Sequence, residues 1–230
     1  MQQDPDTQTG ARLLAAALAH VPFDGWSEAA LKAAAIEAGV APALARALFP
    51  RGGVDLALAW HRQGDASMVA ALHAEDLTAL RFRDRIARAL RLRLEQADKE
   101  LVRRGTTLFA LPHHAADGAR ALWGTADAIW TALGDTRRDF SWMTKRATLA
   151  GVQATVVLFW LGDDSPGHQA TSDFIDRRID DVMQIEKVKA GFRDNPLAKA
   201  VMAGPLRLFE RFRPPPLPPL PTDLPGNLQR

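Results

Sequence analysis

Residues 137–164 read RRDFSWMTKRATLAGVQATVVLFWLGDD, and this stretch decides the fold class. Between Ala147 and Leu161 it carries no charged residue. Its apolar residues recur at the i, i+3, i+4, i+7 spacing of a helix and also occupy the other sides: Leu149, Val152, Val156, Val157, Leu158, Phe159, Trp160 and Leu161. A helix that is apolar all round is buried or spans a membrane. A span needs roughly 20 apolar residues, and Asp163 with Asp164 ends this run sooner. The stretch therefore predicts the central buried helix of a soluble, all-α domain.

The remaining helices are expected on both sides of this one. Their predicted ranges are 11–20, 28–38, 43–49, 54–72, 80–94, 99–110, 114–133 and 170–188. Ser27 is expected to cap the second helix and Gly39 to end it, while Pro22 and Gly25 are expected to break the first. The predicted division is 1–53, 54–190, 191–213 and a proline-rich tail at 214–230.

The composition limits the chemistry. Cysteine is absent, which rules out disulfide and thiolate chemistry. The 29 basic and 27 acidic residues give a net charge of +2, too small to imply nucleic acid by itself. Residues 1–10 resemble neither a secretory signal nor a transit peptide, so the expected location is a bacterial cytoplasm.

No residues indicate catalysis. The chain lacks a nucleophile motif, a phosphate-binding loop and a metal-ligand spacing, so we expect no catalytic residue, no metal site and no cofactor. The pairs Asp163–Asp164 and Asp180–Asp181 are interpreted as solvated carboxylates. The arginines of residues 80–94 form either a solvated face or a site for anions or phospholipid headgroups.

Residues 31–60, LKAAAIEAGVAPALARALFPRGGVDLALAW, resemble the helix-turn-helix of TetR-type regulators. In such proteins the second helix enters the major groove with polar and basic side chains. Here Arg46 is the one basic residue of that helix. The resemblance therefore predicts a TetR-like helical bundle without DNA binding, and a ligand-responsive regulator remains the alternative function.

Four further segments, HVPFDGWSEAALKAAA, LFPRGG, DFSWMTKR and GDDSPG, resemble the coenzyme Q biosynthesis protein nine family in the same order. The resemblance spans Leu14 to Lys187. It implies a TetR-like homodimer that holds an isoprenoid lipid or ubiquinone intermediate in an apolar cavity and assists a ring hydroxylase. In that family DFSWMTKR is the surface for the hydroxylase, which implies partner-binding roles for Trp142, Met143, Lys145 and Arg146. Mitochondrial members have a tyrosine where this chain has Met143.

The lipid-binding residues are expected on the central helix and its neighbours. The predicted set is Leu122, Trp123, Ile129, Trp130, Leu149, Val152, Val156, Phe159 and Phe174. Such residues are ordinarily core, but TetR-type domains usually keep a ligand cavity between the same helices. A cavity with apolar walls suits an alkyl or prenyl chain.

Residues 195–212 form an expected amphipathic helix with an apolar arc and a basic side. Its predicted membrane-binding residues are Leu197, Val201, Met202, Arg207, Leu208, Phe209, Arg211 and Phe212. Such a helix suits an anionic membrane surface, here the inner face of a bacterial membrane. The alternative is that this arc packs on its own domain or on a dimer mate.

Overall fold

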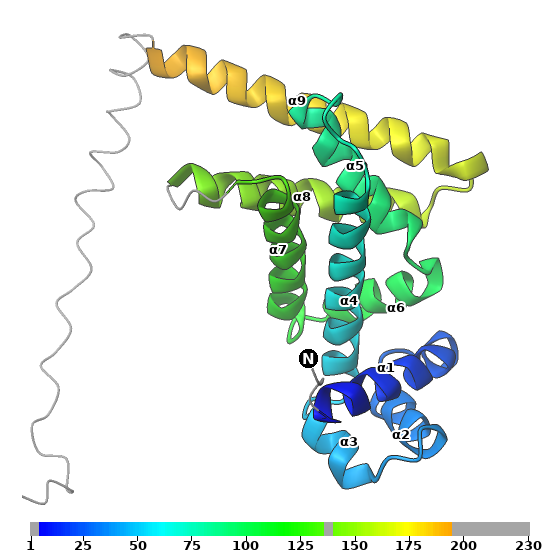
Figure 1. The fold of residues 1–230 in the computed structure, drawn as a ribbon. Helices are drawn as coiled ribbons and strands as arrows, with labels where there is room; N and C mark the ends of the chain where they lie inside the picture. Colours follow the sequence, from blue (N-terminus) through cyan, green and yellow to red (C-terminus); the bar gives the residue numbers. More distant parts are fainter. Residues whose placement is uncertain (1–4, 136–139, 195–230) are drawn as a thin grey trace, which may run out of the picture. The chain divides into compact units, whose positions relative to one another are not determined.

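The structure is a computed structural model and describes residues 5–135 and 140–194. Within these residues it is all-α (Figure 1). The helices are α1 (Pro5–Asp24), α2 (Glu28–Glu37), α3 (Pro42–Leu48), α4 (Gly53–Ala74), α5 (Phe82–Glu95), α6 (Lys99–Phe109), α7 (Ala115–Ala132), α8 (Phe140–Leu161) and α9 (Gln169–Asp194), with a 3₁₀ turn at Pro166–His168. The predicted fold class is confirmed for the described residues.

Helices α1 to α3 form a small helical group at one end of α4 (Figure 1). Ser27 caps α2 by accepting a hydrogen bond from the Ala30 amide at 3.2 Å, as its position before the helix predicts. Gly39 follows α2 with a φ of +62°, a conformation that glycine adopts without strain. The apolar sides of these helices share one core, in which Leu13, Val21 and Ala34 are fully buried.

Helix α1 continues through Pro22, where the sequence predicts a break. Val21 beside it is fully buried, and the Gly25 amide donates to the Val21 carbonyl at 2.8 Å. Packing of the last turn thus keeps the helix intact, and it ends at Asp24.

A second core lies further along α4, where α4, α5, α7, α8 and α9 meet. Met68, Leu90, Ile129 and Ile175 are among its most deeply buried apolar side chains. Figure 1 shows α7 running beside α4, and α8 crossing near the end of α7.

Helix α8 is buried on one side only, whereas the sequence predicted a central helix that is buried on all sides. Val156 and Trp160 are buried, whereas 61% of Leu158 and 37% of Phe159 are exposed. The Phe159 ring stacks on Phe174 of α9, with the ring centroids 4.3 Å apart. Within the described residues, none of the helices combines the length and hydrophobicity needed to cross a membrane.

The arginines of α5 are largely paired inside the fold. Arg88 binds Glu75 at 2.6 Å and Glu95 at 2.7 Å, and Arg91 binds Asp176 of α9 at 2.7 Å. Arg83 pairs with Asp180 of the same helix, α9. These ion pairs connect α5 to its neighbours. They therefore give no support to the interpretation of the α5 arginines as a binding site for anions or phospholipid headgroups.

Helix α9 runs through Gly191 to Asp194, so it continues past the predicted end of the core at residue 190. The predicted amphipathic helix at 195–212 and the tail at 214–230 lie outside the described residues, and so do all eight predicted membrane-binding residues.

Candidate functional site

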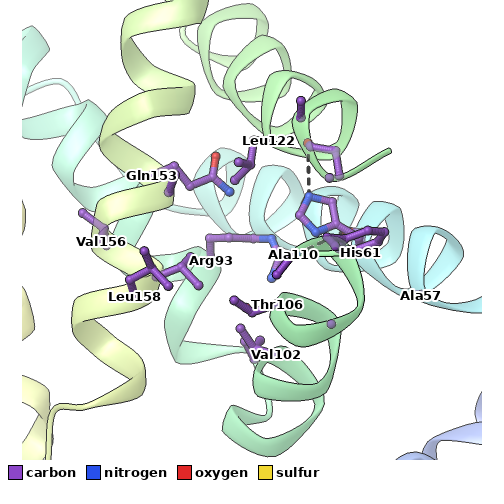
Figure 2. Close-up of a pocket in the computed structure, with 18 of the residues that line it drawn as sticks. Ala57, His61, Arg93, Val102, Thr106, Ala110, Leu122, Gln153, Val156 and Leu158 are labelled. Atoms are coloured by element: carbon purple, nitrogen blue, oxygen red, sulfur yellow. Dashed lines mark hydrogen bonds between the residues drawn. The ribbon is translucent and has the colours of Figure 1, made fainter. Parts of the chain in front are cut away.

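A cavity of about 480 Å³ lies among α4, α5, α6, α7 and α8. Figure 2 shows side chains from these helices pointing into it. Its walls are mainly aliphatic and aromatic, and they include Trp26, Trp60, Leu90, Leu94, Val102, Phe109, Leu122, Val156, Val157 and Leu158. A site of this size and character fits an apolar ligand of the size of a small organic molecule.

The cavity exists because small residues stand where larger ones would fill it. Ala57, Gly105, Ala119 and Ala154 all line it. At position 118 a glycine is also needed for packing, because a Cβ atom there would lie only 2.8 Å from the Cβ of Phe109. The close approach of α7 to the end of α6 thus depends on this glycine.

Trp26 closes one side of the cavity from the loop before α2. Its indole nitrogen donates a hydrogen bond to the Leu101 carbonyl at 3.1 Å, and its ring lies 5.5 Å from that of Trp60. Gly53 begins α4 against the Trp26 backbone, where any Cβ atom would lie 2.2 Å from the Trp26 carbonyl. Residues of the N-terminal helical group therefore form part of the cavity wall.

One part of the wall is polar and internally paired. The Arg93 guanidinium donates to Asp65 at 2.8 Å and to the His61 carbonyl at 3.3 Å. The Thr125 hydroxyl donates to the same Asp65 oxygen at 2.8 Å. Arg93 crosses α4 at Gly64, where a Cβ atom would lie 2.7 Å from the guanidinium carbon. Arg93 and Asp65 are both buried, so each charge is balanced by the other.

His61 completes this polar part without adding charge. Burial lowers its pKa, with Arg93 adding to that effect and Asp65 opposing it. The imidazole is therefore neutral at pH 7. Its Nε2 lies 2.8 Å from the Thr125 hydroxyl oxygen and 3.2 Å from the Ala121 carbonyl. Because the Thr125 proton goes to Asp65, Nε2 is the protonated nitrogen and donates to these oxygens.

Gln153 of α8 is the exception to this pairing. Its side chain is only 3% exposed, it lies on the cavity wall, and its Oε1 atom is buried without a hydrogen-bond partner. Figure 2 shows it extending from α8 toward Leu122 of α7, with Arg93 nearby. Among the described residues no His, Asp and Glu cluster could hold a metal ion.

Comparison with known proteins identifies a family. A family model described as COQ9 matches residues 115–186, a range that includes parts of the cavity wall on α7 and α8. The resemblance predicted from four sequence segments is confirmed.

Relatives of the same name match over most of the chain. The "Ubiquinone biosynthesis protein COQ9, mitochondrial" of Drosophila melanogaster is 32% identical over 187 residues, 76% of this chain and 56% of that protein. Its Homo sapiens namesake is 28% identical over 193 residues, 79% of this chain and 60% of that protein. The Dictyostelium discoideum "Probable ubiquinone biosynthesis protein coq9, mitochondrial" is 29% identical over 186 residues, 77% of this chain and 61% of that protein. The chain thus spans about three fifths of the length of these relatives.

The names of these COQ9 relatives correct the expected location. They are called mitochondrial, which contradicts a bacterial cytoplasm at the inner membrane. The expectation rested on the composition of residues 1–10, and that composition does not fix a compartment.

A solved structure shows the fold. The crystal structure of a TetR transcriptional regulator from Nitrosomonas europaea superimposes with a TM-score of 0.59 at 16% identity, covering 75% of this chain and 96% of that chain. The predicted TetR-like fold is confirmed, and at this identity the likeness concerns the fold alone.

The predicted lipid-binding residues divide into two groups. Leu122 and Val156 line the cavity. The other seven lie elsewhere: Ile129 and Leu149 are buried in the second core, Trp130, Val152 and Phe174 pack against it, Trp123 lies 5.8 Å from the Trp142 ring, and Phe159 is partly exposed on Phe174. The cavity is nearer to α4, α5 and α6 than the sequence predicts.

The COQ9 motif DFSWMTKR contributes both exposed residues and a buried one. Met143 is 49% exposed, and Trp142 and Lys145 are half-buried. Lys145 pairs with Asp135 at 3.1 Å. Arg146 is only 1% exposed, donates to Asp127 at 2.5 Å, and lies under the Trp142 ring at 4.3 Å. Its position makes it a support for Trp142 inside the fold.

The motif GDDSPG forms the turn that leads into α9. Asp163 in this turn is not the solvated carboxylate that the sequence predicted but a buried one. Asp163 is buried and accepts hydrogen bonds from the Ser165 and Thr171 amides, each at 2.8 Å, and from the Thr171 hydroxyl. The bonds from Ser165 and Thr171 hold the pKa of Asp163 well below its usual range. Asp164 is exposed, as expected.

Four polar residues of the site, Arg93, His61, Asp65 and Gln153, were not predicted from the sequence. Two weak signals were present in the sequence. Gln153 is one of the few polar residues in an otherwise apolar helix, and His61 and Asp65 stand four residues apart, the spacing of neighbours on a helix. Arg93 was indistinguishable from the other arginines of α5.

Proposed function

We propose that this chain is a non-catalytic lipid-binding protein of ubiquinone biosynthesis, which holds a prenylated ring intermediate in the cavity and presents it to a ring hydroxylase. The family relationship supports the pathway, because the relatives are named ubiquinone biosynthesis proteins. The observation that carries the proposal is the cavity of about 480 Å³ with mainly apolar walls.

Binding would be driven by burial of the apolar chain. Each buried methylene contributes about 0.8 kcal/mol, so a chain of two isoprene units supplies several kcal/mol toward affinity. The paired polar groups of Arg93, Asp65 and Thr125 need no ligand to satisfy them, so they do not oppose an apolar occupant.

The exposed residues of the DFSWMTKR motif are the proposed hydroxylase contact. Met143 and the half-buried Trp142 offer the aromatic and apolar anchor typical of an interface hot spot. Arg146 supports Trp142 from below, so its replacement would act through the position of the ring. The family resemblance also implies a homodimer.

Replacement of Ala154 tests the cavity. Ala154 lines it, whereas Thr155 is exposed on the next position of α8. Ala154→Leu should reduce the lipid that is recovered by organic extraction and mass spectrometry of purified protein, because the added carbons occupy the cavity. Thr155→Leu, the matched control, should keep the full amount. Absence of lipid in the unmodified protein, or equal recovery from both variants, contradicts the proposal.

A DNA-binding regulator is the weaker alternative. Arg46, the basic residue of α3, is held by Glu28 at 2.5 Å, so the helix that would enter the major groove has no free cation among its seven described residues. We expect no footprint on the DNA beside its own gene at physiological salt, and a stable footprint would favour the regulator.

A further inference from the structure

Gln153 is a polar group in the cavity wall that the fold itself does not use. The side chain is buried, and its Oε1 atom has no hydrogen-bond partner. Figure 2 places it between α8 and α7 at the cavity. Buried amides are almost always hydrogen-bonded, and one left unpaired costs free energy. An unpaired amide at a cavity therefore indicates a hydrogen bond that a ligand completes.

The charges around the cavity limit what that ligand can be. Arg93 is balanced by Asp65, which also accepts from Thr125, and His61 is neutral. No cation in the described wall is left unpaired to receive a carboxylate or a phosphate. An anion would therefore enter the cavity without a counter-charge, which is strongly unfavourable in apolar surroundings.

We propose that Gln153 recognises a ring hydroxyl attached to the apolar part of the ligand, which donates a hydrogen bond to the Oε1 atom. The amide oxygen accepts from a hydroxyl, whereas a ring carbonyl has no proton to donate and would leave this oxygen unpaired. The cavity then discriminates against ionised fatty acids, because no unpaired cation in the described wall would balance a carboxylate inside it. This inference rests on the proposed function, because it specifies the class of ligand for the same cavity.

Four probes with the same geranyl chain test the proposal on delipidated full-length protein. They are a geranylphenol, a geranylbenzoquinone, a geranylbenzene without oxygen and a geranylbenzoate, titrated by calorimetry at a pH of about 8, where the benzoate is ionised. The phenol should bind at least about tenfold more tightly than geranylbenzene, the effect of one buried hydrogen bond. The quinone, which has no proton to donate to Oε1, and the ionised benzoate should both bind more weakly than the phenol.

Gln153→Met supplies the decisive comparison. Methionine has a similar length and no amide, so the variant should bind all three neutral probes with nearly the affinity of geranylbenzene for the unmodified protein. Gln63→Met on the exposed side of α4 is the matched control and should keep the preference. Retention of the preference in Gln153→Met, or tighter binding of the benzoate, overturns the role of Gln153. Failure of all four probes to bind the unmodified protein overturns the proposed function as well.

Discussion

Replacement of Gln153 by methionine should stabilise the lipid-free protein. In the folded state the Oε1 atom of Gln153 is buried without a hydrogen bond, whereas in the unfolded chain water satisfies it. A buried group in this condition costs about 1–3 kcal/mol. Methionine has a similar length and no polar amide, so it removes this cost and keeps the apolar contacts. We expect an increase of about 1–2 kcal/mol in the free energy of unfolding.

Urea denaturation of delipidated protein, followed by circular dichroism, measures this change. With a slope of about 2 kcal/mol per molar urea, the midpoint should rise by about 0.5–1 M. Gln63→Met, a replacement of the same kind on an exposed position of α4, should change stability by less than about 0.5 kcal/mol. A loss of more than about 1 kcal/mol in Gln153→Met would mean that the amide makes a structural hydrogen bond, and the reasoning would fail.

Three further predictions follow from the other parts of the structure. Asp65→Ala leaves the buried Arg93 charge unpaired and should lower the free energy of unfolding, measured by urea denaturation, by about 3–5 kcal/mol. A double variant, Asp65→Leu with Arg93→Met, should recover most of that loss, and no recovery would argue against the ion pair as the cause. Hydrogen bonds depress the pKa of Asp163, so the stability that this carboxylate contributes is complete above the unfolded pKa of about 3.9 and is lost as the pH falls below it. The difference in free energy of unfolding between the unmodified protein and Asp163→Asn should therefore be constant above a pH of about 5 and shrink in acid. A pH-independent difference would refute this prediction. Liposome flotation should show loss of binding to anionic vesicles when the chain is ended at Asp194, and equal flotation of both lengths would leave residues 195–212 as packing only.

Local sequence signals predicted the helices well. Ser27 before α2 and Gly39 after it act as a cap and a helix end because both effects depend on residues a few positions apart. Pro22 misled the prediction of the end of α1, since the burial of Val21 comes from distant partners and outweighs the local preference of proline.

Burial of α8 was harder to predict than its helical form. Its sequence is apolar on all sides, yet Leu158, at the edge of the cavity, and Phe159, which stacks on Phe174 of α9, keep 61% and 37% of their side chains exposed. Hydrophobicity indicates that a side chain can be buried, but which side is covered depends on the elements that pack there.

The cavity was the least predictable feature. It exists because small residues meet from separate helices, such as Gly105 of α6, Gly118 of α7 and Ala154 of α8, and no single stretch of sequence contains that information. Periodicity selects residues with buried faces, which explains why it found core residues such as Ile129 more readily than cavity residues.

A crystal structure of the protein with the geranylphenol bound would show whether Gln153 contacts a ligand in the cavity. We expect the geranyl chain to lie among α4, α5, α6, α7 and α8, with the ring oxygen within hydrogen-bond distance of the Gln153 amide. A ligand found outside this cavity, or one with its ring oxygen turned away from Gln153, would contradict this expectation.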